Sequence, residues 1–207
     1  MNNTHKKLSL LVLSDIFILS SFGLIAPIFA VFIMENLIGG SIVTAGLATT
    51  IFLVVKSSVQ LPLSKYFIDK HNHKARFLVM GTFLIITVPF IYVTAKSVNT
   101  IFIAQAIYGL GAALAYPAWF SLFTIYMDKK QRGFEYAIYT TAVGISVAIA
   151  AFLGAKLAEV VGFKALFFIV GAVAFLGFLF LIALYRLETK KAKSGKFPNH
   201  PFNKKRK

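Results

Sequence analysis

Residues 100–126 read TIFIAQAIYGLGAALAYPAWFSLFTIY, a run without Asp, Glu, Lys or Arg. An α-helix needs about 20 residues to cross the hydrocarbon core of a bilayer. Five further apolar runs of comparable length cover 8–33, 42–66, 75–97, 134–158 and 163–186. The runs are continuous rather than alternating, which favours helices over the strands of a closed barrel. We therefore predict an all-α membrane protein with six transmembrane helices.

The composition excludes an ordinary soluble domain. Of the 207 residues, 58% are hydrophobic and 14% are charged, whereas soluble domains carry about 25% charged residues. There is no cysteine, which excludes a disulfide framework and a thiolate metal site. The first apolar run is too long for the core of a signal peptide, so we expect it to be retained as the first helix.

The positive charge is unevenly distributed. The chain holds 22 Lys and Arg against 7 Asp and Glu, a net charge of +15. Alternate connections and the two termini carry most of the bases, and the opposite connections hold only Lys96 and Lys164. This positive-inside pattern predicts that both termini are cytoplasmic. The basic groups lie at Lys6 and Lys7, at Lys65, Lys70, Lys74 and Arg76, at Lys129, Lys130 and Arg132, and from Arg186 to Lys207.

We expect three parts along the chain. Residues 1–7 form a cytoplasmic N-terminus, 8–186 a six-helix membrane domain, and 187–207 a basic, disordered cytoplasmic tail attracted to anionic lipid head groups. The tail has neither a fold nor an aromatic stacking platform, so we expect no nucleic-acid partner. Its basic, polar ending resembles a natural terminus and weakly favours a complete product.

No enzyme constellation is present in the sequence. All four histidines lie outside the apolar runs. An intramembrane serine protease needs a histidine beside a buried serine, and a zinc site needs comparable ligands. There is no phosphate-binding loop. We therefore expect no enzymatic activity, cofactor or metal.

Among the charged side chains within the apolar runs, Asp15 and Lys56 are the two most informative. A charge in the hydrocarbon costs at least about 2.5 kcal/mol on insertion scales, so it usually faces a partner or water. With both termini inside, the predicted depths of the two residues differ by about 5 Å. One interpretation is a switchable ion pair, or an acid that carries a proton while Lys56 contacts substrate. The alternative is a static pair, or a lysine that snorkels toward the membrane surface.

The predicted helix 134–158 has one face of small residues. Such a face lets another helix backbone approach closely. This face either packs against other helices of the same six-helix bundle or contacts a second bundle that completes the protein. The sequence leaves both interpretations open. The predicted helix-packing residues are Thr141, Gly144, Ala148 and Ala151, flanked by Ala137 and Ala155.

Several motifs together resemble one six-helix half of the major facilitator superfamily. The first helix reads SDIFILSSFGLIAPIFAVFI, from 14 to 33, and the loop after the second reads LSKYFIDKHNHKARFLVMG, from 63 to 81. QAIYGLGAALAYPAWF, from 105 to 120, matches the glycine-rich fourth helix, and 128–172 resembles the stretch from there into the sixth helix. The chain departs from the family pattern at Lys65 and Asn72, where glycines are usual, and at Gln105, where an arginine linked to proton coupling is common.

The resemblance implies a secondary active transporter that moves a small molecule by alternating access, with proton coupling in doubt at Gln105. Helices 8–33 and 100–126 would line a central cavity suited to an amphipathic or cationic molecule. The loop acid and its flanking bases would bias the conformational equilibrium through charge-assisted bonds. The implied substrate and ion-coupling residues are Asp15, Phe22, Lys56, Gln105, Tyr108, Tyr116 and Trp119, and the implied gating residues are Asp69, Lys70, Lys74 and Arg76.

Six helices are half of such a transporter. Related transporters have two halves related by an axis along the membrane normal, and two copies with the same orientation satisfy that symmetry. We therefore expect a parallel homodimer in the plasma (inner) membrane, with lipid and a small-molecule substrate as its other partners. The alternatives are a non-transporting membrane scaffold and a half-transporter that needs a different chain.

Overall fold

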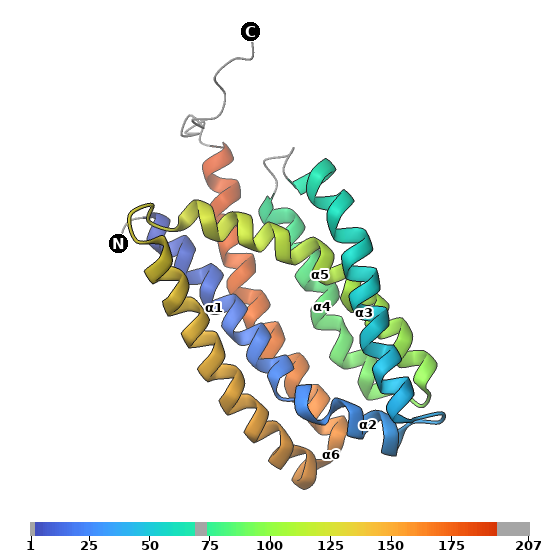
Figure 1. The fold of residues 1–207 in the computed structure, drawn as a ribbon. Coiled ribbons are helices and arrows are strands. Elements are labelled where there is room, and N and C mark those ends of the chain that lie inside the picture. Colours follow the sequence, from blue (N-terminus) through green and yellow to red (C-terminus); the bar gives the residue numbers. More distant parts are fainter. Residues whose placement is uncertain (1–2, 69–73, 194–207) are drawn as a thin grey trace.

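The computed structural model describes residues 3–68 and 74–193, and within these ranges the chain is helical with no extended strand. Figure 1 shows long helices running side by side along one bundle. The elements are α1 (Asn3–Gly23), the 3₁₀ turn η1 (Ala26–Ile28), α2 (Phe29–Asn36), α3 (Ile42–Leu63), the π-helical turn η2 (Ser64–Ile68), α4 (Lys74–Thr94), α5 (Val98–Tyr126) and α6 (Arg132–Lys193).

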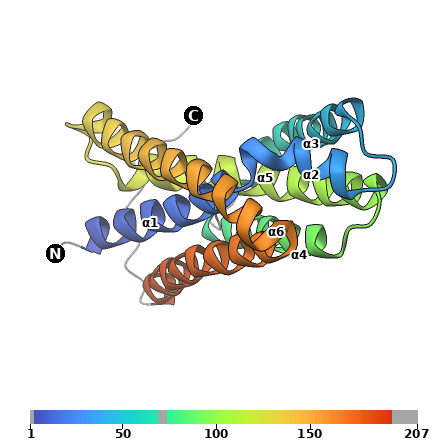
Figure 2. The ribbon, with the colours of Figure 1, turned by 90° about the horizontal axis from the view of Figure 1, so that it is seen from below.

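The first predicted helix, 8–33, is not continuous. It is divided into α1, η1 and α2, and Pro27 lies inside the short 3₁₀ turn. Proline has no backbone N–H and cannot continue an α-helical ladder. Within η1 the chain instead uses the tighter pattern, with the Ile28 N–H donating to the Ile25 carbonyl. The break redirects α2 so that it lies beside α3 (Figure 2).

The last two predicted helices, 134–158 and 163–186, form the single element α6. Its backbone is non-helical at Gly162, where φ is 78° and ψ is 165°. Only glycine adopts this conformation without a steric cost. Figure 1 shows that α6 reverses direction, so that 132–161 and 163–193 run as two antiparallel arms. Five helical segments of the described chain are long and apolar enough to cross a membrane, and the segment within α6, Arg132–Thr189, is the longest of them.

Most basic residues of the described ranges lie near one end of the bundle. The start of α1 and the end of α6 lie at this end, together with the start of α4 and the turn between α5 and α6 (Figure 1). At the other end, the 37–41 and 95–97 connections are tied by backbone hydrogen bonds, in which the Ile38 N–H donates to Lys96 and the Val98 N–H to Ile38.

The predicted disordered tail begins at 187, but α6 continues as far as Lys193. Glu188 explains part of this extension. Its carboxylate accepts hydrogen bonds from the buried ammonium of Lys7 on α1 and from the hydroxyl of Tyr126 on α5. This three-helix contact holds the end of α6 against the bundle. The remainder of the predicted tail, 194–207, lies outside the described residues.

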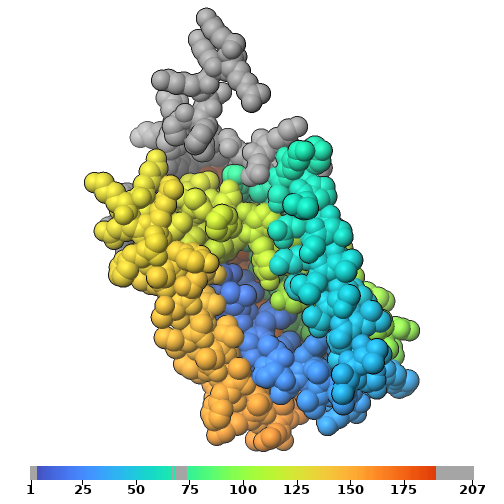
Figure 3. Space-filling view, viewed as in Figure 1, coloured from blue at the N-terminus to red at the C-terminus, as the bar shows by residue number. Residues whose placement is uncertain are grey.

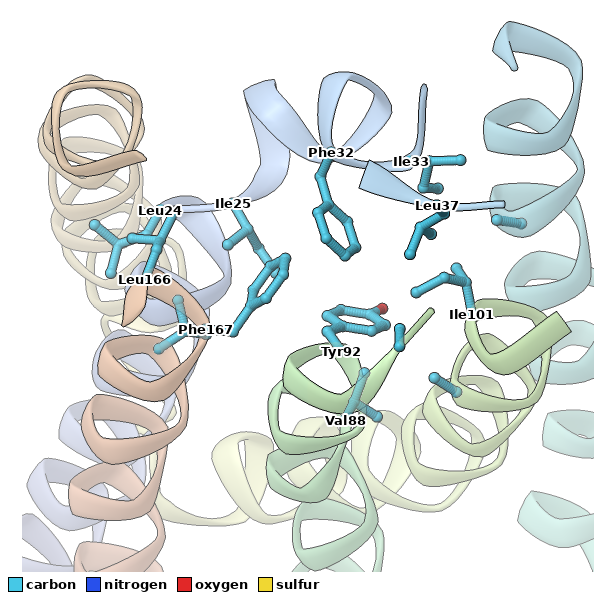
Figure 4. Packing of buried hydrophobic residues seen from close by; sticks show 14 of the residues in the cluster. Leu24, Ile25, Phe32, Ile33, Leu37, Val88, Tyr92, Ile101, Leu166 and Phe167 are labelled. Carbon is cyan, nitrogen blue, oxygen red and sulfur yellow. The ribbon is translucent and has the colours of Figure 1, made fainter. Parts of the chain in front are cut away.

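Two apolar clusters form the core. Figure 4 shows the cluster at the end of the bundle that carries α2, where Phe32, Tyr92 and Phe167 meet from three elements. The Phe32 and Phe167 rings lie 4.7 Å apart, and the Tyr92 and Phe167 rings 5.4 Å apart, both edge to face. The second cluster, around Leu11, Phe123 and Leu181, lies toward the basic end. Together they fix α1, α4, α5 and the second arm of α6.

By contrast, α3 and the first arm of α6 leave large surfaces uncovered. Only 11% of the most apolar window of α3 is buried, against 39–44% for the other long helices. In Figure 3 these two elements stand on either side of a hollow, and α1 and α5 are set back between them.

Candidate functional site

A small cavity lies where α1, α4 and α5 meet. Its volume is about 20 Å³, enough for about one water molecule. Of the predicted site residues, five line it: Asp15 and Phe22 from α1, and Tyr108, Tyr116 and Trp119 from α5. The remaining wall is mainly apolar and comes from Ile18, Leu19, Leu78, Thr82, Ile85 and Ala115.

Glycines let the helices around this cavity approach closely. A Cβ on Gly109 of α5 would lie 2.8 Å from the Phe52 carbonyl oxygen and 3.1 Å from the Lys56 backbone nitrogen, both on α3. A Cβ on Gly177 of α6 would lie 2.8 Å from the Ser14 carbonyl oxygen on α1. These backbone contacts place α3 beside α5, and α6 beside the residue that precedes Asp15.

Asp15 is held by a residue that the sequence analysis did not single out. The hydroxyl of Tyr139, on the first arm of α6, donates a hydrogen bond to the Asp15 carboxylate. The Tyr139 ring lies 4.7 Å from the Trp119 ring and 5.2 Å from the Phe123 ring. The acid is therefore fixed by a hydrogen bond from one helix and an aromatic wall from another.

Trp119, which lines the cavity, has an unused hydrogen-bond donor. Its indole nitrogen is buried and has no hydrogen-bond partner among the described residues. A buried polar group without a partner costs free energy, and such a group commonly marks a site for a water or ligand.

Lys56 lies on the other side of Tyr116. Its ammonium nitrogen is 4.6 Å from the centre of the Tyr116 ring and 5.9 Å from that of Phe52. Among the described residues, Asp15 and Lys56 form no ion pair with one another. In this structure the acid is partnered by a tyrosine hydroxyl and the lysine by aromatic faces, while Tyr116 borders both.

Gln105 lies apart from this cavity. Its side chain is buried and its amide donates a 3.2 Å hydrogen bond to the hydroxyl of Tyr92 on α4. Gln105 therefore connects α4 to α5 near the end of the bundle that carries α2. The family resemblance implied that Gln105 belongs with Tyr108 and Tyr116 at the substrate site, but its long side chain turns to a polar partner, which here is Tyr92.

Two of the four predicted gating residues can be located. Lys74 begins α4 and donates a 3.5 Å hydrogen bond to the Ile68 carbonyl, and Arg76, two residues further into the helix, is exposed. Asp69 and Lys70 lie outside the described residues. Lys74 thus connects the start of α4 to the π-helical turn that ends the preceding helix.

The small-residue face of α6 is directed outward. Thr141, Gly144 and Ala148 are exposed and Ala151 is partly exposed; a Cβ on Gly144 would meet nothing within 4 Å. Packing inside the bundle uses a different face of the same arm. Ala150 and Gly154 contact Gly23, the last residue of α1, and Leu24 after it, and a Cβ on Gly154 would lie 1.8 Å from the Leu24 carbonyl oxygen.

The structure adds Tyr139 and Phe52 to the residues around the site. Both are aromatic residues inside apolar runs, and nothing in their spacing separates them from ordinary packing residues. One signal was available for Phe52, since a residue four positions before a lysine lies on the same helix face. Tyr139 could not be found in this way because its partner is 124 positions away.

Comparison with known proteins identifies the family of this chain. The family model of the Major Facilitator Superfamily matches residues 11–206. The chain belongs to the major facilitator superfamily. As a member of this superfamily, it is a membrane protein related to transporters rather than to enzymes.

A curated relative is an uncharacterized MFS-type transporter from Methanocaldococcus jannaschii, which is 27% identical over 163 residues. That match covers 79% of this chain but 40% of the relative. The chain thus spans less than half of the length of this superfamily member.

Proposed function

We propose that the chain is a secondary active transporter that moves a small molecule across the plasma (inner) membrane by alternating access. The observation that carries this proposal is the acid Asp15, held by Tyr139 beside an aromatic cavity within the apolar part of the bundle. A charge in that environment is costly and usually functional. Phe22, Tyr108, Tyr116 and Trp119 would contact the substrate, and Asp15 would carry a proton if transport is proton-coupled.

In this proposal the chain crosses the membrane six times, and both arms of α6 are separate crossings. Both termini are then cytoplasmic. The concentration of basic residues at the end that holds the start of α1 and the end of α6 supports this orientation. The residues that would gate the cytoplasmic side, Asp69, Lys70, Lys74 and Arg76, belong to the same end.

We further propose that two parallel copies form the transporter. The hollow of Figure 3 lies between α3, which is the least buried of the long helices, and the first arm of α6, in which few residues are buried. A two-fold axis through the hollow and along the membrane normal brings α3 of one copy opposite α6 of the other. The exposed residues Thr141, Gly144 and Ala148 would allow close contact there. Each copy would contribute one Asp15 and one Lys56 to the shared cavity.

A half-transporter that pairs with a different chain is the second candidate. It is favoured by the length of the relative from Methanocaldococcus jannaschii, of which this chain covers 40%. A non-transporting scaffold is a weaker alternative, because a scaffold gains nothing from the cost of an intramembrane acid.

The test is transport by the purified full chain in proteoliposomes. An imposed pH gradient and an internal pH-sensitive dye would be combined with panels of sugars, organic acids and organic cations. We expect compounds from at least one panel to collapse the pH gradient. Asp15→Asn should abolish this response while the protein stays folded. Asp128→Asn is the matched control, since Asp128 lies in the exposed turn before α6 and accepts a hydrogen bond from the Lys130 N–H.

Each outcome distinguishes the candidates. Gradient collapse that survives Asp15→Asn unchanged contradicts the proton-carrier role. Activity in the presence of this chain alone supports the homodimer, whereas activity that appears only when a second six-helix chain is added supports the half-transporter. A folded protein that transports no compound from any panel contradicts the transporter proposal.

A further inference from the structure

Lys56 occupies an aromatic corner that is built by two helices. Phe52 comes from the preceding turn of α3, and Tyr116 comes from α5, where Gly109 allows the two helix backbones to meet. The ammonium lies closest to the Tyr116 ring, at 4.6 Å from its centre. A cation above an aromatic face is attracted by the ring quadrupole, and the attraction strengthens when the cation is shielded from water. The corner is therefore shaped to hold an alkylammonium group.

The same chain offers a comparison that separates this corner from a simple helix contact. Lys156 lies 4.7 Å from the centre of the Phe152 ring, at the same four-residue spacing. That pair lies on the exposed surface of α6, where 63% of Phe152 is accessible, and among the described residues no second ring is recorded within range of the Lys156 ammonium. Lys56 differs because it has a second ring from another helix, and because that ring, Tyr116, also borders the cavity with Asp15.

We propose that the Phe52–Tyr116 corner recognises an alkylammonium group of the transported molecule, and that Lys56 is a tethered occupant which the substrate displaces. This inference rests on the proposed transport function for its biological meaning. The Lys56 ammonium occupies the corner when no substrate is bound. An incoming amine exchanges with Lys56 at Tyr116, and the Asp15 carboxylate in the adjoining cavity attracts it by charge.

The single tryptophan of the chain makes the binding step measurable. Trp119 lines the cavity beside Tyr116, so its fluorescence reports on an occupant. The probe is n-butylammonium, which reproduces the lysine side chain beyond its Cα, and n-butanol is its neutral counterpart. Both would be titrated into the detergent-solubilised full chain, in the wild type and in Lys56→Ala.

We expect n-butylammonium to bind Lys56→Ala at least tenfold more tightly than the wild type, because the tethered competitor is gone. n-Butanol should show no such difference. Lys156→Ala should behave as the wild type. Equal affinity of n-butylammonium for the wild type and Lys56→Ala, or an equal gain for n-butanol, overturns the proposal. If Lys56→Ala is not folded by size-exclusion chromatography, Lys56→Ser replaces it, with the same expectations.

Failure of this inference can be told apart from failure of the transport proposal. If Lys56→Ala binds n-butylammonium but not n-butanol and no transport is seen in proteoliposomes, the ammonium site is supported and the transport proposal is contradicted. If the protein transports molecules that lack an amine and Lys56→Ala binds n-butylammonium no more tightly than the wild type, the transport proposal is supported and the ammonium site is contradicted.

Discussion

At the scale of single residues, the contact between Asp15 and Tyr139 connects α1 to the first arm of α6. We predict that Tyr139→Phe lowers the free energy of unfolding by about 1 kcal/mol, a value typical of interhelical hydrogen bonds in membrane proteins. The ring, with its contacts to Trp119 and Phe123, is retained in this variant. Unfolding in mixed micelles with increasing SDS measures the change.

A double-mutant cycle with Asp15→Asn shows whether the loss comes from this hydrogen bond, because residues in direct contact give non-additive effects. Tyr136→Phe is the control, since Tyr136 lies one turn away and is exposed. Fully additive effects of Tyr139→Phe and Asp15→Asn would contradict the assignment of the hydrogen bond.

At the scale of helices, the approach of α3 to α5 depends on Gly109. A Cβ at this position would lie 2.8 Å from the Phe52 carbonyl oxygen, so Gly109→Ala must push the two helices apart. Overpacking of this kind costs about 1–3 kcal/mol, and we expect a loss in that range together with a change in Trp119 fluorescence.

The matched control is Gly46→Ala on α3, where a Cβ would meet nothing within 4 Å. Alanine is a better helix former than glycine by up to about 1 kcal/mol, so this variant should be neutral or more stable. Thermal unfolding measured for the two variants side by side checks the pair. A Gly109→Ala protein as stable as Gly46→Ala would show that α3 and α5 are not in close contact.

The ends of three helices are joined by Glu188. We predict that Glu188→Gln lowers the stability by at most about 1 kcal/mol, because the carboxylate is partly exposed and its pair with Lys7 is screened by solvent. The amide oxygen can still accept the hydrogen bond from Tyr126. Thermal unfolding at low and high salt measures the loss, which should shrink as salt rises, and the exposed Glu159→Gln serves as its control. A loss that is equal at both salt concentrations would point to packing rather than to the ion pair.

At the scale of the whole molecule, the proposed homodimer predicts which residues of two copies lie near one another. The two-fold axis places α3 of one copy opposite the first arm of α6 of the other. The chain has no cysteine, so introduced cysteines report without background. We expect the exposed positions Thr50 and Ala148, both changed to cysteine, to give a disulfide-linked dimer in native membranes.

The control pair is Met80→Cys with Phe175→Cys, on the exposed surfaces of α4 and the second arm of α6. This pair should remain monomeric under the same oxidation. Equal crosslinking of both pairs would indicate random collision in the membrane, and the absence of any Thr50–Ala148 product would count against the two-fold arrangement.

The sequence by itself determined the membrane class, the superfamily and the approximate helix bounds. These properties depend on local runs of apolar residues and on short motifs, so they can be read without knowing which helices touch. The acid Asp15 was also identifiable, because a charge inside an apolar run is conspicuous wherever its partner lies. The break at Pro27 and the reversal at Gly162 were visible as residue types, but whether each would bend or end a helix depended on the surrounding packing.

Only the tertiary structure decided the partners. It joined Asp15 to Tyr139, Lys56 to Tyr116, Gln105 to Tyr92 and Glu188 to Lys7. Apart from Gln105 and Tyr92, which are 13 positions apart, these contacts join residues 60 or more positions apart. The physical reason is that side-chain contacts between helices depend on the rotation and crossing of each helix about its axis, which are fixed by backbone approaches at Gly109, Gly154 and Gly177 and not by the apolar pattern.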